Sequence, residues 1–173
     1  MKNERGTTLV ELIIYIGIVG MILTTISMFL INLLTTRVKT SAMSEVLTNS
    51  RLVQDRLHDA VRHAEGINLG ASVFGSDPGT LSINMVDVLD DPIIFSLTAD
   101  NGQFQINKAG AGNAILTSDH VEVTNLVFTN LTSVDDVGII RVDMTLRAVN
   151  PSDDNLYNYE ESFQTTLRIP LDQ

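Results

Sequence analysis

The beginning of the chain is dominated by a long apolar segment. Residues 12–36 contain no charged side chain, and most of them are Ile, Leu, Val, Met or Phe. An α-helix needs about 20 predominantly apolar residues to cross the hydrocarbon core of a bilayer. The segment therefore predicts a transmembrane helix, which Arg37 and Lys39 close at its carboxyl end. A secretory signal peptide fits less well, because its apolar region is only about 7–15 residues long.

A second helical pattern follows between residues 44 and 65. Apolar side chains recur there at helical spacing, and charged side chains occupy the positions between them. No Pro interrupts the pattern, and Gly66 stands where a helix would end. We therefore expect one helix over residues 8–65, the second half of which is amphipathic. The apolar positions of this half are Val46, Val53, Leu57, Ala60, Val61 and Ala64.

The period changes toward two after residue 80. Apolar and polar residues alternate over residues 141–148, which is typical of a half-buried antiparallel strand. Clusters of Asp, Asn, Gly and Pro separate the apolar segments, as turns do. These patterns predict an α+β fold, in which a long N-terminal helix, part transmembrane and part amphipathic, packs on an antiparallel β-sheet domain. The expected strands are residues 81–86, 93–97, 103–107, 114–117, 121–131, 138–149 and 161–169.

One carboxylate interrupts the apolar start of the first helix. Glu11 stands between Val10 and Leu12, and a charged residue in hydrocarbon costs about 3 kcal/mol and is usually functional. Alternatively, Thr8 and Glu11 have the spacing of a capping box, in which two side chains satisfy backbone N–H groups at a helix start. A plain signal anchor explains the helix but gives no reason for the carboxylate. The residues alone leave both interpretations of Glu11 open.

The residues before this helix form a compact pattern. A short leader with Lys2 and Arg5 ends at Gly6, and Glu11 follows five positions later at the start of the apolar segment. The pattern Gly6-Thr-Thr-Leu-Val-Glu11 resembles the processing signal of the type IV pilin family. In that family a peptidase cuts after the Gly, the new amino terminus is N-methylated, and the Glu pairs with the amino terminus of a neighbouring subunit. Members usually have Phe or another bulky apolar residue where this chain has Thr7.

The resemblance implies a role for each of these residues. Cleavage would fall between Gly6 and Thr7, Thr7 would be N-methylated, and Glu11 would act in assembly. Gly17 and Gly20 would permit close packing of helices in a filament. The implied organisation is a leader over residues 1–6, a transmembrane and polymerisation helix over 7–40, an amphipathic helix over 41–66 and a β head domain over 67–173.

The same resemblance implies a cellular setting. Lys2 and Arg5 would hold the amino end in the bacterial cytoplasm, so that the chain crosses the inner membrane once with its head domain outside and later enters a periplasmic or surface filament. The expected partners are other pilin or pseudopilin subunits, the prepilin peptidase and the inner-membrane assembly machinery. Residues 51–64 and 162–168 also loosely resemble minor pseudopilins, especially the J-type subunit of type II secretion.

Composition and charge narrow the chemistry. The chain has no Cys, which excludes disulfides, zinc–cysteine sites and thiolate catalysis. The net charge is −10, and only Glu4 and Glu11 among the acidic residues precede residue 40. A surface of this sign disfavours direct nucleic-acid binding, which depends on Lys and Arg neutralising phosphates.

A few side chains outside the helix start are candidate metal ligands. His58 and His63 point about 140° apart on a helix, so we interpret them as exposed helix residues, and His120 has no obvious partner. The clusters Asp90-Asp91 and Asp153-Asp154-Asn155 are either solvated turns or part of a calcium loop. Neither matches the twelve-residue calcium-binding pattern, so no metal site is predicted.

The leading hypothesis is a structural role. No Gly-rich phosphate loop, nucleophile elbow or His-Glu-x-x-His motif occurs, so we predict no enzyme activity and no cofactor. We expect a minor pilin or pseudopilin of a type IV pilus, a type II secretion pseudopilus or a related filament. The alternative is a binding module at a filament tip, which contacts a surface, DNA or a secretion substrate. A membrane-anchored enzyme or sensor is a weaker alternative, because an anchor needs no carboxylate at Glu11.

Overall fold

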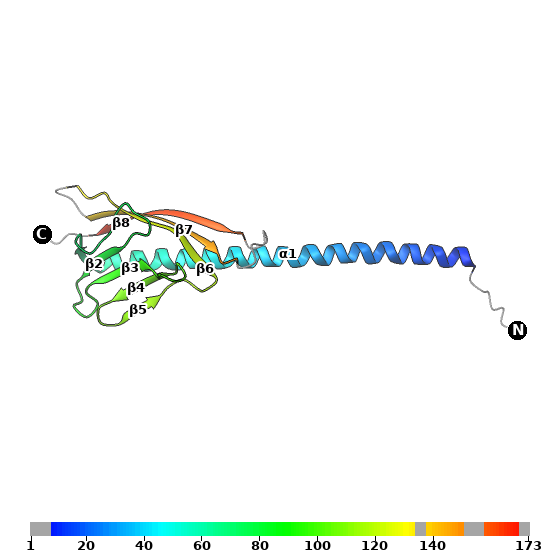
Figure 1. Ribbon diagram of the computed structural model, residues 1–173, viewed down its shortest axis with the longest axis horizontal. Helices are drawn as coiled ribbons and strands as arrows, with labels where there is room; N and C mark the ends of the chain where they lie inside the picture. Colours follow the sequence, from blue (N-terminus) through cyan, green and yellow to red (C-terminus); the bar gives the residue numbers. More distant parts are fainter. Residues whose placement is uncertain (1–7, 134–137, 151–157, 170–173) are drawn as a thin grey trace. The chain divides into compact units, whose positions relative to one another are not determined.

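The computed structural model describes residues 8–133, 138–150 and 158–169 of the chain. The chain divides into two compact units, Met1–Val38 and Lys39–Gln173, which we call the stem and the head. Helix α1 (Leu9–Arg62) contributes its first part to the stem and its second part to the head (Figure 1). The strands of the described residues, β1 to β8, all belong to the head.

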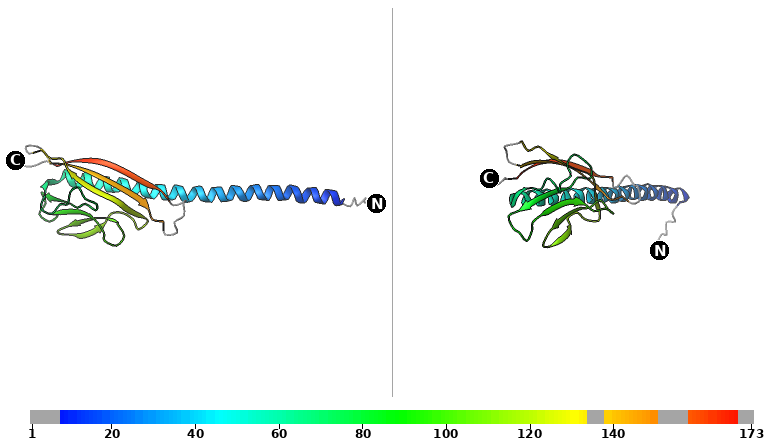
Figure 2. Two further views of the ribbon diagram at one scale, coloured as in Figure 1. Left: turned by 45° about the horizontal axis from the view of Figure 1, so that its top comes forward. Right: turned by 60° about the vertical axis from the view of Figure 1, so that its left-hand side comes forward.

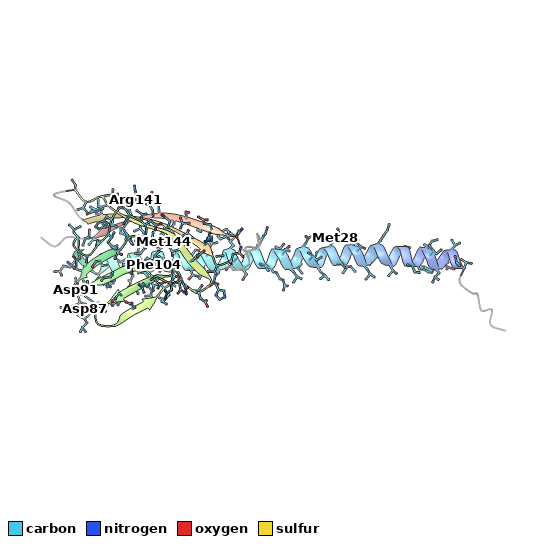
Figure 3. All side chains as sticks on the ribbon, in the orientation of Figure 1. Met28, Asp87, Asp91, Phe104, Arg141 and Met144 are labelled. Atoms are coloured by element: carbon cyan, nitrogen blue, oxygen red, sulfur yellow. The ribbon has the colours of Figure 1, made fainter. Side chains whose placement is uncertain are left out.

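The stem is a stretch of α1 without a core of its own. Every large apolar side chain from Leu9 to Leu34 is at least 40% exposed, and Figure 3 shows Met28 projecting from the helix surface. The hydroxyl groups of Thr24 and Thr25 each donate to a carbonyl oxygen one turn earlier, at 2.8 and 2.9 Å, so the helix satisfies them internally. By length and composition, α1 can cross a membrane.

In the head, α1 is amphipathic, as the sequence predicts. Val46, Val53 and Leu57 have no exposed surface, and the other predicted apolar positions of this segment are at most 6% exposed. The charged residues between them, Arg51 and Asp55 among them, are exposed. The apolar face of this part of α1 is therefore covered by the sheets of the head.

The helix ends earlier than predicted. It stops at Arg62, whereas the sequence pattern predicted a helix through residue 65 with Gly66 as its stop. The next residues form β1 (Ala64–Ile67), which pairs antiparallel with β2 (Leu81–Met85) and has a bulge between Ala64 and Gly66. Backbone N–H and C=O groups of β1 form hydrogen bonds with β2 in place of the bonds that a longer helix would form. Ala64 is buried, as its place in the helical pattern also predicted. Tertiary pairing overrides local helix propensity here.

The first sheet is a five-stranded antiparallel meander in the order β1-β2-β3-β4-β5. Its later strands are β3 (Ile93–Leu97), β4 (Phe104–Lys108) and β5 (Gly112–Ile115). The predicted strands are confirmed: β3 has the expected bounds, and the boundaries of β2, β4 and β5 differ by one or two residues. β5 is the exposed edge strand, and its shortness limits unwanted pairing with other chains.

A second, three-stranded sheet contains β6 (Val121–Asn130), β7 (Gly138–Ala148) and β8 (Glu160–Ile169) in that order. The predicted antiparallel pairing is confirmed, but the strands form two separate sheets. β6 does not pair with β5. Instead, a loop covers the outer edge of β6: the N–H groups of Gly75 and Gly79 donate to carbonyl oxygens of β6 at 2.8 Å.

One hydrophobic cluster joins α1 to both sheets, and Figure 2 shows the head part of α1 running along them. Phe95 and Phe104 stack within it, with ring centroids 5.7 Å apart and planes 11° apart. Phe104 and Met144, one from each sheet, are fully buried and lie inside the head in Figure 3. Burial of each such side chain stabilises the fold by about 1.5–3 kcal/mol, so the head has a core that the stem lacks.

A partly buried polar network also ties α1 to the connection between β5 and β6. The Asn49 side chain accepts a hydrogen bond from the Ser118 backbone N–H at 2.9 Å and donates to the Glu45 carbonyl oxygen at 2.8 Å. The Ser118 hydroxyl donates to Glu45 Oε1 at 2.7 Å. Because Asn49 is only 6% exposed, these bonds replace the water that its amide would otherwise contact.

Candidate functional site

The candidate site is the first turn of α1, where Glu11 lies. The Thr8 hydroxyl accepts a hydrogen bond from the Glu11 backbone N–H at 3.3 Å, and the Thr8 carbonyl oxygen accepts one from the Leu12 N–H at 3.1 Å. Thr8 is therefore the N-cap of the helix. This is the Thr half of the capping box that the spacing suggested, and it uses the backbone of Glu11 and not its carboxylate.

The Glu11 carboxylate is bound by a different residue. The Tyr15 hydroxyl donates a hydrogen bond to Glu11 Oε1 at 3.2 Å. The sequence interpretation missed Tyr15, although a signal was present: residues four apart on a helix are neighbours, and Tyr15 has a side-chain hydroxyl one turn after Glu11. The structure thus pairs Glu11 with Tyr15 and leaves the cap to Thr8.

The surroundings of this pair are apolar and exposed. Val10, Leu12 and Ile14 next to the pair are all more than half exposed, and Glu11 is exposed as well. Among the described residues, Glu11 Oε2 has no hydrogen-bond partner. A carboxylate in such a position can accept hydrogen bonds from a cation that approaches the helix from outside, and the negative charge also complements the positive end of the helix dipole.

The remaining residues predicted for this site lie on both sides of Glu11. Gly6 and Thr7, the predicted cleavage and methylation positions, lie outside the described residues. Gly17 and Gly20 lie on exposed turns of α1, and a Cβ atom added at either would meet nothing within 4 Å. No side chain covers the helix backbone at these glycines, so another helix can approach it closely there.

The histidines have more partners than the sequence suggested. His58 is half-buried, and its Nε2 lies 3.2 Å from the Thr165 hydroxyl of β8, which corrects the interpretation of an exposed residue. His63 is exposed, as expected, and it follows the last residue of α1. Its Nδ1 lies 2.9 Å from the Asp59 carbonyl oxygen. His120 Nδ1 lies 2.7 Å from Asp119 Oδ1. The fold, and not the local sequence, supplied the partner of His58.

The Asp pair considered for calcium has structural partners. Asp90 forms an ion pair with Lys108 at 2.6 Å, and Asp91 Oδ1 accepts a hydrogen bond from the Met85 N–H at 2.9 Å. The other candidate, Asp153-Asp154-Asn155, lies outside the described residues. Within the described part of the chain, no three His, Asp or Glu side chains cluster closely enough to hold a metal ion.

The head also carries a groove of about 540 Å³ between the end of α1 and strands β2, β3 and β4. Buried side chains including Ala60 and Ile93 line it, together with the charged Arg56 and Lys108. The loop after β2 exposes three large apolar side chains, those of Val86, Val88 and Leu89, and Figure 3 shows Asp87 of this loop at the end of the head.

No protein-family model, no curated protein and no solved structure matches the chain. A long N-terminal helix, apolar at its start and packed on antiparallel strands at its end, is nevertheless a pilin-like architecture.

Proposed function

We propose that this protein is a structural subunit, a minor pilin or pseudopilin, of a type IV pilus, a type II secretion pseudopilus or a related filament. One observation carries the proposal: a carboxylate, Glu11, lies on the first turn of a helix whose large apolar side chains from Leu9 to Leu34 are all exposed. An anchor or an ordinary helix start needs no such group, because Thr8 alone forms the cap.

Assembly supplies the physical reason for the carboxylate. After cleavage behind Gly6, the amino group of Thr7 on a neighbouring subunit meets Glu11 in an apolar setting. Each charge then offsets the desolvation of the other, whereas either charge alone would be strongly unfavourable there. Packing of the exposed apolar side chains between helices, with close approach at Gly17 and Gly20, stabilises the filament.

The same reasoning gives the membrane setting before assembly. The apolar stem spans the inner membrane, with Lys2 and Arg5 on the cytoplasmic side, and the head lies outside. The partners are other subunits, the prepilin peptidase and the assembly machinery of the inner membrane.

Cleavage of the leader is the first test. The full chain is expressed with and without a prepilin peptidase, and its intact mass is measured. We expect the peptidase to remove residues 1–6 and to methylate Thr7, Gly6→Ala to be cut more slowly, and Gly6→Leu to stay uncut. An uncut wild-type chain beside an active peptidase and a cleaved control substrate would show that the proposed function is wrong.

Assembly of a Glu11→Gln variant is the second test. The Thr8 cap uses the backbone N–H of Glu11, so the substitution leaves the helix start and membrane insertion intact. Loss of one partner of a buried ion pair costs about 3–5 kcal/mol, so incorporation into sheared filaments is expected to fall sharply while the membrane fraction is unchanged. Glu4→Gln, a matched change in the leader, is the control. Equal incorporation of Glu11→Gln and wild-type subunits would leave Glu11 with no role in assembly.

A binding module at a filament tip is the second candidate function, and the groove beside the exposed loop Val86–Leu89 favours it. Exposed apolar side chains gathered beside a groove are typical of binding surfaces. A Val88→Asp variant should then assemble normally but lose adhesion, DNA uptake or secretion. A variant that retains all three would argue for a purely structural subunit.

A further inference from the structure

The start of α1 offers few hydrogen-bond donors to a carboxylate. From Leu9 to Leu23, Tyr15 is the one residue whose side chain can donate a hydrogen bond. Thr8 lies one turn before Glu11, and its hydroxyl oxygen accepts from the Glu11 N–H. Within the described part of the chain, this hydroxyl makes no hydrogen bond to the Glu11 carboxylate. Among the described residues, the Tyr15 hydroxyl is thus the side-chain donor to the Glu11 carboxylate, at 3.2 Å.

Tyrosine suits this position physically. Its ring is apolar and packs among hydrocarbon, while its hydroxyl donates a hydrogen bond. A carboxylate removed from water loses several hydrogen bonds, and leaving its oxygens unpaired is costly. A hydrogen bond to a charged group is stronger than one between neutral groups. Tyr15 therefore lowers the cost of holding Glu11 at the apolar start of the stem.

The two carboxylate oxygens of Glu11 also have different surroundings. Tyr15 occupies Oε1, while Oε2 has no partner among the described residues. One hydrogen bond restricts the rotation of the Glu11 side chain, and Oε2 keeps both of its acceptor positions for an incoming donor. An oriented acceptor loses less conformational entropy on pairing than a freely rotating one.

We propose that Tyr15 is a positioning residue for Glu11: its hydroxyl holds Oε1 in the membrane and presents Oε2 to the amino group of a neighbouring subunit. This inference rests on the proposed function, because it assigns the amino group as the partner. It adds a specific prediction to that function, since a Phe at position 15 would keep the apolar ring and lose the positioning.

The assembly test compares two Tyr→Phe variants of the full chain, expressed with a prepilin peptidase and a filament assembly system. Tyr159→Phe is the matched control, because Tyr159 likewise donates to a carboxylate, that of Glu161, at 3.1 Å but lies in the head. We expect Tyr15→Phe to lower the ratio of filament to membrane subunits by about tenfold, the loss of one charge-assisted hydrogen bond, and Tyr159→Phe to leave it unchanged. Equal ratios for Tyr15→Phe and wild type would overturn the proposal.

A spectroscopic test separates this inference from the proposed function. The full chain is placed in phosphatidylethanolamine–phosphatidylglycerol nanodiscs, and the Raman ring doublet of Tyr15 is obtained as the wild-type minus Tyr15→Phe difference. It should report a donating hydroxyl, and this signature should disappear in a Glu11→Leu background. A doublet unchanged by Glu11→Leu would overturn the proposal. A wild-type chain that is neither cut nor assembled would overturn the proposed function, and the positioning role with it, whatever the doublet shows.

Discussion

The Asn49 network offers a test of what holds the head together. Asn49→Ala removes the oxygen that accepts from the Ser118 N–H at 2.9 Å and the amide that donates to the Glu45 carbonyl oxygen. The Ser118 N–H then loses its acceptor at a half-buried position, next to the buried site of Asn49. A buried donor without a partner costs about 1–3 kcal/mol, and the small cavity adds to this. We expect the free energy of unfolding to fall by about 2 kcal/mol.

Two further variants separate the parts of this network. Ser118→Ala removes the hydroxyl that donates to Glu45 Oε1 at 2.7 Å but keeps the backbone N–H bonded to Asn49. Its expected cost is about 1 kcal/mol. Thr48→Ala changes an exposed neighbour on the same helix and should stay within about 0.5 kcal/mol of the wild type.

Urea unfolding of residues 39–173, followed by far-ultraviolet circular dichroism, measures these differences. Because the variants remove no large surface, the slope of free energy against urea should be unchanged and only the midpoint should shift. The expected order of destabilisation is Asn49→Ala, then Ser118→Ala, then Thr48→Ala. If Asn49→Ala and Thr48→Ala have the same midpoint, the network does not stabilise the packing of α1 on the head and the reasoning is wrong.

Three other predictions concern the head. The fragment Lys39–Gln173 should be soluble and folded, because every buried apolar side chain of the described residues lies at Ala42 or beyond, and a circular dichroism spectrum of a disordered chain would contradict this. Leu57→Ala should cost about 2–5 kcal/mol in urea unfolding, since Leu57 is completely buried, and a loss below 1 kcal/mol would argue against that packing. Desolvation and then the neighbouring Glu161 carboxylate raise the pKa of Tyr159 above its ordinary value of 10.0, so its contribution to stability should be complete below pH 10 and disappear as the pH rises through the folded-state pKa. An ultraviolet titration compared with Tyr159→Phe measures that pKa, and a midpoint at or below 10.0 would be inconsistent with this environment.

Much of the fold could be predicted because its signals are local. Residues 12–36 are too apolar and too long for an ordinary surface helix, and the structure has α1 there. The alternation of Val142, Met144 and Leu146 with polar residues predicted the buried face of β7, and those three side chains are buried. Both patterns indicate which residues of a helix or strand avoid water, and they can be recognised without knowing which element packs against it.

The candidate site was predicted in part for the same reason. Glu11 was identified by its place in an apolar segment, and the cap at Thr8 by its spacing. Helical spacing also places Tyr15 one turn after Glu11, but only the structure shows that its hydroxyl donates to the carboxylate. The roles of Gly6 and Thr7 remain predictions from the resemblance, because these residues lie outside the described ones.

By itself, the sequence determined the long helix, its apolar and amphipathic parts, the positions of strands β2 to β8 and the carboxylate at the helix start. Only the tertiary structure decided where the helix ends, because β1 forms through pairing of Ala64–Ile67 with β2. It also decided the division into two sheets, since a loop at Gly75 and Gly79 covers the edge of β6. Hydrophobic periodicity specifies which face of a helix or strand is buried. The partner of a strand is selected by hydrogen bonds between distant segments, and it depends on which backbone groups the rest of the fold leaves unpaired.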